Sequence, residues 1–158
     1  LQVIGDFSFR NCYKLKSIGD TSRITMIRRE ALNNTLIPEL ILPSCTSLAG
    51  CGYYSAIRKI VAPLLTELNG SVLRMQNLDY LEVGELLSSI AAYTFWQMTT
   101  DKTIFICRAV SPPSLGAYNN MNFCKAIYVP DASVGSYKAA SGWSSYTSKI
   151  KPLSEYQG

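Results

Sequence analysis

The sequence predicts an α/β solenoid, a fold in which one kind of coil is stacked on itself many times. A pattern of apolar-x-x-apolar-x-apolar returns six times along the chain. Its central residues, spaced by 22, 20, 21, 23 and 23 residues, are Ile18, Leu40, Ile60, Leu81, Ile104 and Ile127. A period of roughly 20 to 50 residues is typical of repeat proteins, whose coils bury each other's apolar edges. Hydrophobic residues make up 47% of the chain and charged residues 16%, a composition typical of a packed chain.

Each copy of the pattern predicts a short strand. Side chains alternate along a strand, so the first, fourth and sixth positions should point into the core and the others toward solvent. A second apolar pair precedes the strand in several repeats. The pairs are Leu1 and Ile4, Ile24 and Ile27, Leu65 and Leu68, and Leu87 and Ile90. We expect these pairs to form a second apolar edge of each coil.

Three repeats depart from this pattern. The stretch 44–54 in repeat three lacks a clear first apolar pair, and its Gly50 and Gly52 predict a loosened turn. Asp101 in repeat five and Pro113 in repeat six stand where an apolar residue is expected. Irregularity of this kind is common in natural solenoids and does not by itself indicate a site.

The chain divides into a solenoid over residues 1–130 and a capping segment over 131–158. Asp131 is a good helix N-cap, Val134 and Tyr137 would share one helical face, and Gly142 would end the helix. The residues expected to cover the last coil are Trp143, Tyr146, Ile150 and Leu153. The amino end shows no such cap, which predicts that upstream repeats are missing and that the first coil could support a dimer.

Two segments resemble a known family. Residues 4–15, Ile-Gly-Asp-Phe-Ser-Phe-Arg-Asn-Cys-Tyr-Lys-Leu, resemble the BspA-like leucine-rich repeat, whose unit runs I-G-x-x-A-F-x-x-C-x-x-L. Residues 127–143 resemble the closing segment common in such proteins from gut Bacteroides-type bacteria. The resemblance implies a right-handed leucine-rich-repeat superhelix of short parallel strands and helical turns, with a C-terminal helical cap. It also implies a secreted or cell-surface protein that acts in adhesion or partner binding, with no shared catalytic residues.

Charge and cysteine usage exclude several classes of function. The net charge of +4 is scattered along the chain, whereas nucleic-acid binding needs a concentrated basic patch. No apolar run approaches the roughly 20 residues that span a bilayer. The five cysteines include no Cys-x-x-Cys, and the chain has no histidine, so the usual zinc spacings fail and we expect no metal or cofactor. Cys12 and Cys124 are expected to be buried thiols. The sequence does not decide whether Cys45 and Cys51 form a disulfide.

The outward strand positions predict the binding surface. Adjacent strands lie about 4.8 Å apart, so their outward residues should form a ladder. We expect this ladder to contact a ligand. Its members are Ile41, Val61, Tyr80, Glu82, Phe105 and Tyr128. Exposed apolar and aromatic patches often mark protein or glycan binding sites. Lys16, Arg58, Lys102 and Lys125 form a flanking basic column that could favour acidic partners or simply be a solvated edge.

We therefore expect a noncatalytic recognition or adhesion module that binds an extracellular protein or glycan. The alternatives are a structural spacer that presents another domain and a carbohydrate-binding module. β-branched and aromatic residues also favour strands for their own sake, and a neighbouring domain or loop could cover part of the ladder.

Enzymatic activity is disfavoured. Without histidine, Ser-His and Cys-His nucleophiles cannot form, and the commonest general base is missing. The remaining option is a pair of carboxylates, Glu39 and Glu82, which would lie about 10 Å apart, near the separation of an inverting glycosidase. Chance explains this spacing easily, and we expect no catalytic residues.

Overall fold

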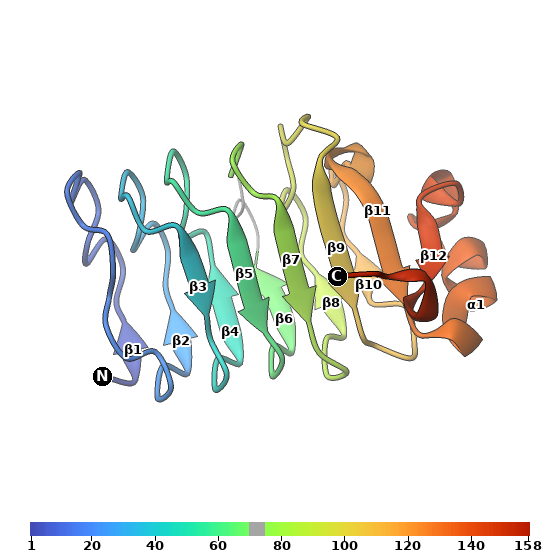
Figure 1. The fold of residues 1–158 in the computed structure, drawn as a ribbon, viewed down its shortest axis with the longest axis horizontal. Coiled ribbons are helices and arrows are strands. Elements are labelled where there is room, and N and C mark those ends of the chain that lie inside the picture. The colour runs from blue at the N-terminus through green and yellow to red at the C-terminus, as the bar shows by residue number, and fades with distance from the viewer. Residues whose placement is uncertain (70–74) are drawn as a thin grey trace.

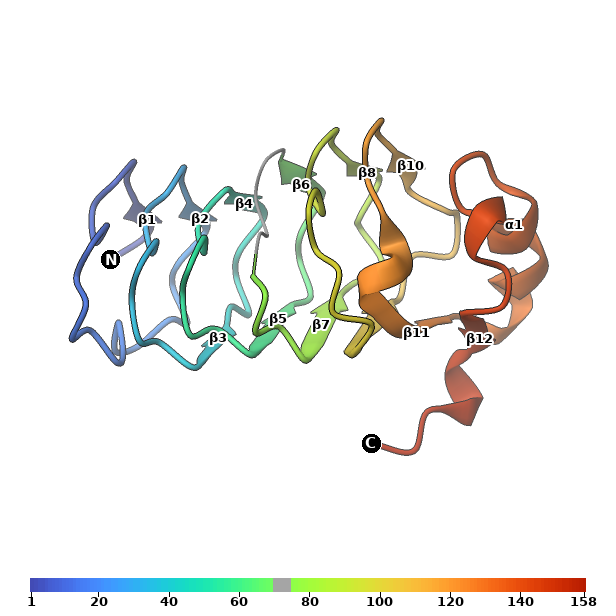
Figure 2. The same cartoon turned by 90° about the horizontal axis from the view of Figure 1, so that it is seen from above.

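Two parallel sheets run along opposite sides of a stack of coils in the computed structural model, which describes residues 1–69 and 75–158 (Figures 1 and 2). Sheet A contains β1 (Val3–Ile4), β2 (Met26–Ile27), β4 (Ser47–Ala49), β6 (Glu67–Asn69), β8 (Ser89–Ile90) and β10 (Ser114–Leu115). Sheet B contains β3 (Glu39–Ile41), β5 (Lys59–Ala62), β7 (Tyr80–Val83), β9 (Thr103–Cys107), β11 (Cys124–Val129) and β12 (Ile150–Pro152). The predicted parallel solenoid is confirmed.

Sheet A is built on the second apolar pairs of the sequence. The later member of each pair lies in register with its neighbours, as Ile4 does with Ile27 and Leu68 with Ile90. These side chains are buried. The pairs therefore form a second sheet, with strands of two or three residues.

The coils turn mostly without helices. Among the described residues the α-helix is α1 (Val134–Ala139), and the short 3₁₀ turns are η1 (Met121–Phe123), η2 (Asp131–Ser133), η3 (Ser144–Tyr146) and η4 (Leu153–Glu155). Left-handed φ angles of 54–63° recur after the strands of sheet A, at Phe7, Glu30, Tyr93, Tyr118, Asn11, Asn34 and Gln97. A left-handed residue reverses the local turn and prevents a helix from propagating. The predicted helical turns are thus few.

Sheet B begins one coil later than predicted. The first copy of the pattern, Leu15 to Ile18, forms no strand, and β3 is the edge of the sheet. Gly19 follows with φ +74°, a conformation outside the extended region that a strand requires.

Repeat five is shifted by one residue from the predicted frame. β9 pairs Phe105 with Leu81 and with Ile127, both inward residues, and Phe105 is fully buried. The prediction that Phe105 belongs to an exposed ladder is therefore wrong. The run Ile104-Phe105-Ile106-Cys107 is apolar throughout, so periodicity cannot fix its frame. Asp101 at a supposed core position is the signal that the frame is displaced.

Aromatic packing explains why Phe105 takes the inward position. Its ring centroid lies 6.2 Å from that of Phe95 and 6.5 Å from that of Trp143. Phe123 packs 4.7 Å from Phe95, and Tyr137 packs 5.1 Å from Trp143. Large rings fill this end of the core more fully than an isoleucine would, and burying them favours this register.

Repeat three contains a first apolar pair that its sequence does not show clearly. Cys45 and Leu48 occupy the place of the first apolar pair, and both are buried. A Cβ added to Gly52 would lie 2.0 Å from Met75 Cε. Gly50 and Gly52 are both buried, and the absence of a side chain at Gly52 allows Met75 to approach this turn closely.

The thiols divide between the core and the open end of the stack. Cys124 is buried, as expected, but Cys12 is exposed because its first coil has no described coil stacked on its outer side. Cys45 and Cys51 are free and buried. Burial raises the pKa of Cys51 to about 12, and both thiols therefore behave as small apolar groups.

The cap closes the stack with different contacts from those predicted. Asp131 caps no helix; its carboxylate accepts a hydrogen bond from the Ser154 amide at 3.0 Å. Helix α1 ends at Ala139, before Gly142. Tyr137, Trp143 and Ile150 are buried as expected. The Trp143 indole donates to Pro113 O at 2.8 Å, and β12 pairs with β11 to extend sheet B.

Candidate functional site on the outer face of sheet B

The register of sheet B arranges its outward side chains in two rows. The first row contains Ile41, Val61, Glu82, Ile106 and Tyr128. The second row contains Glu39, Lys59, Tyr80, Ile104 and Ala126. Five of the six predicted ladder residues thus share one face, and Ile106 takes the place of Phe105. We call this surface the outer face.

The part of the outer face over β3 and β5 is open. Ile41 is 41% exposed, Glu39 and Lys59 are exposed, and Val61 is half-buried beside Ile41. Ile41 and Val61 are β-branched and stand on adjacent strands about 4.8 Å apart. Together they present a flat apolar surface. Because each strand is paired within the sheet, these side chains are held on a rigid scaffold.

The part over β7, β9 and β11 is covered by the segment that follows β12. Ile106 and Ala126 point outward by register, yet they are only 1% and 4% exposed. The ring centroid of Tyr156 lies 6.3 Å from that of Tyr80 and 5.1 Å from that of Tyr128. Figure 1 shows this segment passing in front of β9. The segment after β12 therefore covers part of the ladder. The sequence alone did not show whether a domain or a loop would do so.

A charged pair lies inside the outer face. Tyr80 Oη donates to Glu82 at 2.6 Å, and Arg108 Nε donates to the other carboxylate oxygen at 2.8 Å. Burial tends to raise the pKa of Glu82, but the hydrogen bonds from Tyr80 and Arg108 outweigh it and hold the pKa below its usual value. Burial, followed by the bond to Glu82, raises the pKa of Tyr80. At neutral pH Glu82 is an anion and Tyr80 a neutral donor.

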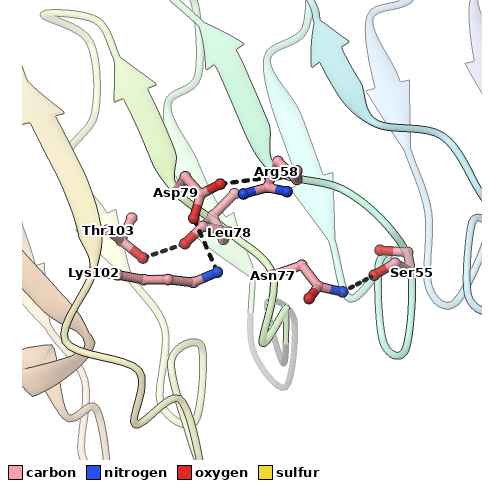
Figure 3. Close-up of polar contacts among 7 residues, drawn as sticks. All are labelled: Ser55, Arg58, Asn77, Leu78, Asp79, Lys102 and Thr103. Carbon is pink, nitrogen blue, oxygen red and sulfur yellow. Dashed lines mark hydrogen bonds and ion pairs between the residues drawn. The ribbon is translucent and has the colours of Figure 1, made fainter.

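Two of the four residues in the basic column, Arg58 and Lys102, take part in a structural contact. Asp79, directly before β7, accepts from Arg58 Nε at 2.6 Å and from Lys102 Nζ at 2.9 Å (Figure 3). Hydrogen bonding from Lys102 lowers the pKa of Asp79; burial opposes this effect, and the bond from Arg58 reinforces it. Thr103 Oγ1 also donates to Leu78 O at 2.6 Å. Arg58 and Lys102 therefore join neighbouring coils, which favours the solvated-edge interpretation of this column.

The two candidate carboxylates lie on the same face, two strands apart. Glu39 lies in the second row on β3 and Glu82 in the first row on β7, two strands away. Glu82 is engaged by Tyr80 and Arg108. The Glu82 carboxylate is therefore engaged in contacts within the outer face.

Sequence reasoning missed four residues of the outer face: Ile104, Ile106, Arg108 and Tyr156. Ile104 and Ile106 were hidden by the uniform apolar run in β9. Tyr156 lies outside the repeats, so no periodicity assigns it to a row. Another exposed aromatic group was also missed, in which Tyr93 stacks on Tyr118 at 4.6 Å and meets Trp96 edge-on at 5.9 Å. It lies in the turns that follow β8 and β10, away from sheet B.

A family model matches most of this architecture. The model describes a BspA type leucine rich repeat region, with six copies over residues 1–102. The chain belongs to this BspA-type leucine-rich repeat family. No curated protein matches the chain. The matched region includes the open part of the outer face and β7, while β11 and the cap lie beyond it.

This BspA-type repeat protein is a repeat scaffold of a kind that is generally noncatalytic. Within residues 1–69 and 75–158, no three His, Cys, Asp or Glu side chains gather where they could hold a metal ion. In the same residues, no helix is both long and apolar enough to cross a membrane.

Proposed function

We propose that this chain is a noncatalytic recognition module of a secreted or cell-surface protein, and that it binds an extracellular macromolecule through the outer face of sheet B. The observation that carries the proposal is the open apolar surface at Ile41 and Val61, held on paired strands beside the charged Glu39 and Lys59. The extracellular setting rests on the family, whose members are often surface-related.

The chemistry of this surface suits recognition. Apolar side chains supply binding energy when they are desolvated, and charged neighbours at the rim set orientation and partner choice. Lys59 Nζ lies 5.3 Å from the centre of the Tyr80 ring, so the charged rim continues directly into the aromatic part of the face. Such a surface can bind without moving its backbone.

The test is a binding screen of the folded chain against extracellular-matrix proteins, mucins and a glycan array. The variant Ile41→Ser/Val61→Ser removes the apolar surface at half-exposed positions. Leu86→Ser is the matched control, because Leu86 is 57% exposed and lies in the turn after β7. We expect the double variant to weaken binding at least about tenfold, the size of a hot-spot loss, and the control to bind normally. Equal binding by all three proteins would overturn the proposal.

A structural spacer is the second candidate, and the contacts between coils favour it. Asp79 joins the coils of Arg58 and Lys102, and Asn77 Nδ2 donates to Ser55 O at 3.1 Å (Figure 3). Contacts of this kind stiffen a solenoid along its axis. A folded chain that binds nothing across the panel would favour the spacer over recognition, whereas hits confined to glycans would indicate a carbohydrate-binding module.

A further inference from the structure

In the covered part of the outer face the Tyr156 ring lies against Tyr80 and Tyr128. We call this place on the sheet, with the neighbouring Ile106 and Ala126, the socket. Tyr80 on β7 and Tyr128 on β11 flank Tyr156, and the outward residues Ile106 on β9 and Ala126 on β11 are buried. The register places Ile106 beside Tyr128 and Glu82, and Ala126 beside Ile104. The socket therefore has aromatic sides, an apolar floor and the Glu82–Arg108 pair at its margin.

The segment that fills the socket is itself mostly exposed. Ser154, Glu155, Gln157 and Gly158 are exposed, whereas Tyr156 and Leu153 are half-buried. The Ser154 amide donates to the exposed Asp131, and the Tyr156 amide closes a turn onto Leu153 O at 3.0 Å. A segment attached through one half-buried ring and exposed hydrogen bonds opens at low cost compared with a core strand.

The topology determines how a ligand could occupy this place. β9 is paired with β7 on one edge and with β11 on the other. A partner therefore cannot add a strand there. It must instead bind by placing its own side chains against the outer face. The segment 153–158 does this with Tyr156.

Resting on the function proposed above, we propose that the socket of Tyr80, Ile106, Ala126 and Tyr128 binds an extended peptide segment of a protein partner through an aromatic side chain. Tyr156 occupies the socket in cis and is displaced by that segment. Occupation in cis lowers the apparent affinity for the partner, because an intramolecular competitor acts at high effective concentration. The neighbouring open surface at Ile41 and Val61 would contact the rest of the same partner.

The test uses methyl NMR of the full chain and the acetylated hexapeptide Leu-Ser-Glu-Tyr-Gln-Gly as the probe. The variant Tyr156→Ala empties the socket, and Tyr118→Ala removes an exposed tyrosine elsewhere as the control. We expect Tyr156→Ala to shift the Ile106 and Ala126 methyl signals, and Tyr118→Ala to leave them in place. Millimolar hexapeptide should move the shifted signals back toward their wild-type positions and should bind the wild type at least about tenfold more weakly.

The same hexapeptide with alanine in place of tyrosine should leave the signals where they are. The proposal is overturned if the tyrosine peptide does not move them, or if a methyl glycoside moves them and the peptide does not. The variant Asp131→Ala, which removes the hydrogen bond to Ser154, provides a second route to an emptied socket should Tyr156→Ala fail to fold. If a partner from the screen binds in a manner that depends on Ile41, but the tyrosine peptide does not bind, only this inference is overturned. Peptide binding with no effect of Ile41→Ser/Val61→Ser on any partner would remove the proposed function instead.

Discussion

The ring centroid of Tyr156 lies 5.1 Å from that of Tyr128. Tyr156 belongs to the segment after β12, and Tyr128 belongs to β11 of sheet B. This contact divides the outer face into an open part over β3 and β5 and a covered part over β7 to β11. Both parts lie on one rigid sheet, so a ligand of the open part would approach the edge of the covered one.

The register of β9 predicts unequal costs for two neighbouring substitutions. Phe105→Ala should lower the free energy of unfolding by about 3–5 kcal/mol, because it removes a buried ring between Phe95 and Trp143. Ile104→Ala, at a half-buried outward position, should cost about 1 kcal/mol. Urea unfolding of both variants measures the difference. Equal costs, or a larger cost for Ile104, would restore the frame that the sequence predicted.

How much could be predicted from the sequence depends on how distinctive each repeat is. Ile41, Val61, Glu82 and Tyr128 lie in one row as predicted. In each of their strands a charged residue at or beside the apolar run fixes the frame, and these residues are Glu39, Lys59, Glu82 and Lys125. In β9 four apolar residues follow one another, so the choice of inward residue depends on the size of the rings contributed by Phe95 and Trp143. Those contacts are distant in sequence and invisible to a local pattern.

The cap illustrates the same limit. Burial of Tyr137, Trp143 and Ile150 followed from their hydrophobicity, but the position of Tyr156 depends on the path of the chain after β12. Aspartate is a residue type favoured at helix N-caps, yet the Asp131 carboxylate accepts a hydrogen bond from the Ser154 amide instead. A tertiary hydrogen bond here replaces the local one that the sequence suggests.

Two glycines should respond oppositely to alanine. A Cβ at Gly84 would lie 1.7 Å from Pro63 O, on the backbone of the neighbouring coil, so Gly84→Ala must push two coils apart. We expect a loss of about 1–3 kcal/mol in the free energy of unfolding, typical of overpacking. Gly135 in α1 has open space around it, and Gly135→Ala should stabilise the chain by about 0.5–1 kcal/mol. Thermal melts of both variants make the comparison, and a neutral Gly84→Ala would contradict the close approach.

Removing the Asp79 carboxylate should destabilise the chain in a pH-dependent manner. Asp79→Asn breaks the contacts with Lys102 and Arg58, which are partly exposed, so the expected cost at pH 7 is about 1 kcal/mol or less. The pKa of Asp79 is lowered in the folded chain. Its stabilisation is therefore complete above the ordinary pKa of 3.8 and is lost as the pH falls through the lower folded-state value.

Urea unfolding of the wild type and Asp79→Asn between neutral and strongly acidic pH provides the measurement, with the exposed Glu85→Gln as the control. The two stabilities should converge in acid. A gap that persists at the lowest pH would show that the effect comes from something other than the charge of Asp79.

Thiol labelling should distinguish Cys12 from the other cysteines. Cys12 is exposed and the remaining four are buried, so a thiol reagent should modify one cysteine in the native chain. After unfolding without reductant, all five should react, because Cys45 and Cys51 are free. Mass spectrometry counts the labels. Three labels after unfolding would reveal a disulfide and contradict this assignment.

The most direct measurement of the central claim is a map of isoleucine methyl shifts when a partner from the binding screen is added to the chain. Ile41 lies on the open surface, while Ile24, Ile27 and Ile90 lie in the core beside sheet A. We predict that the Ile41 methyl signal shifts most, followed by Ile104 and Ile106, and that the three core methyl groups remain unchanged. Shifts confined to the turns or to sheet A, with Ile41 unmoved, would contradict recognition through the outer face.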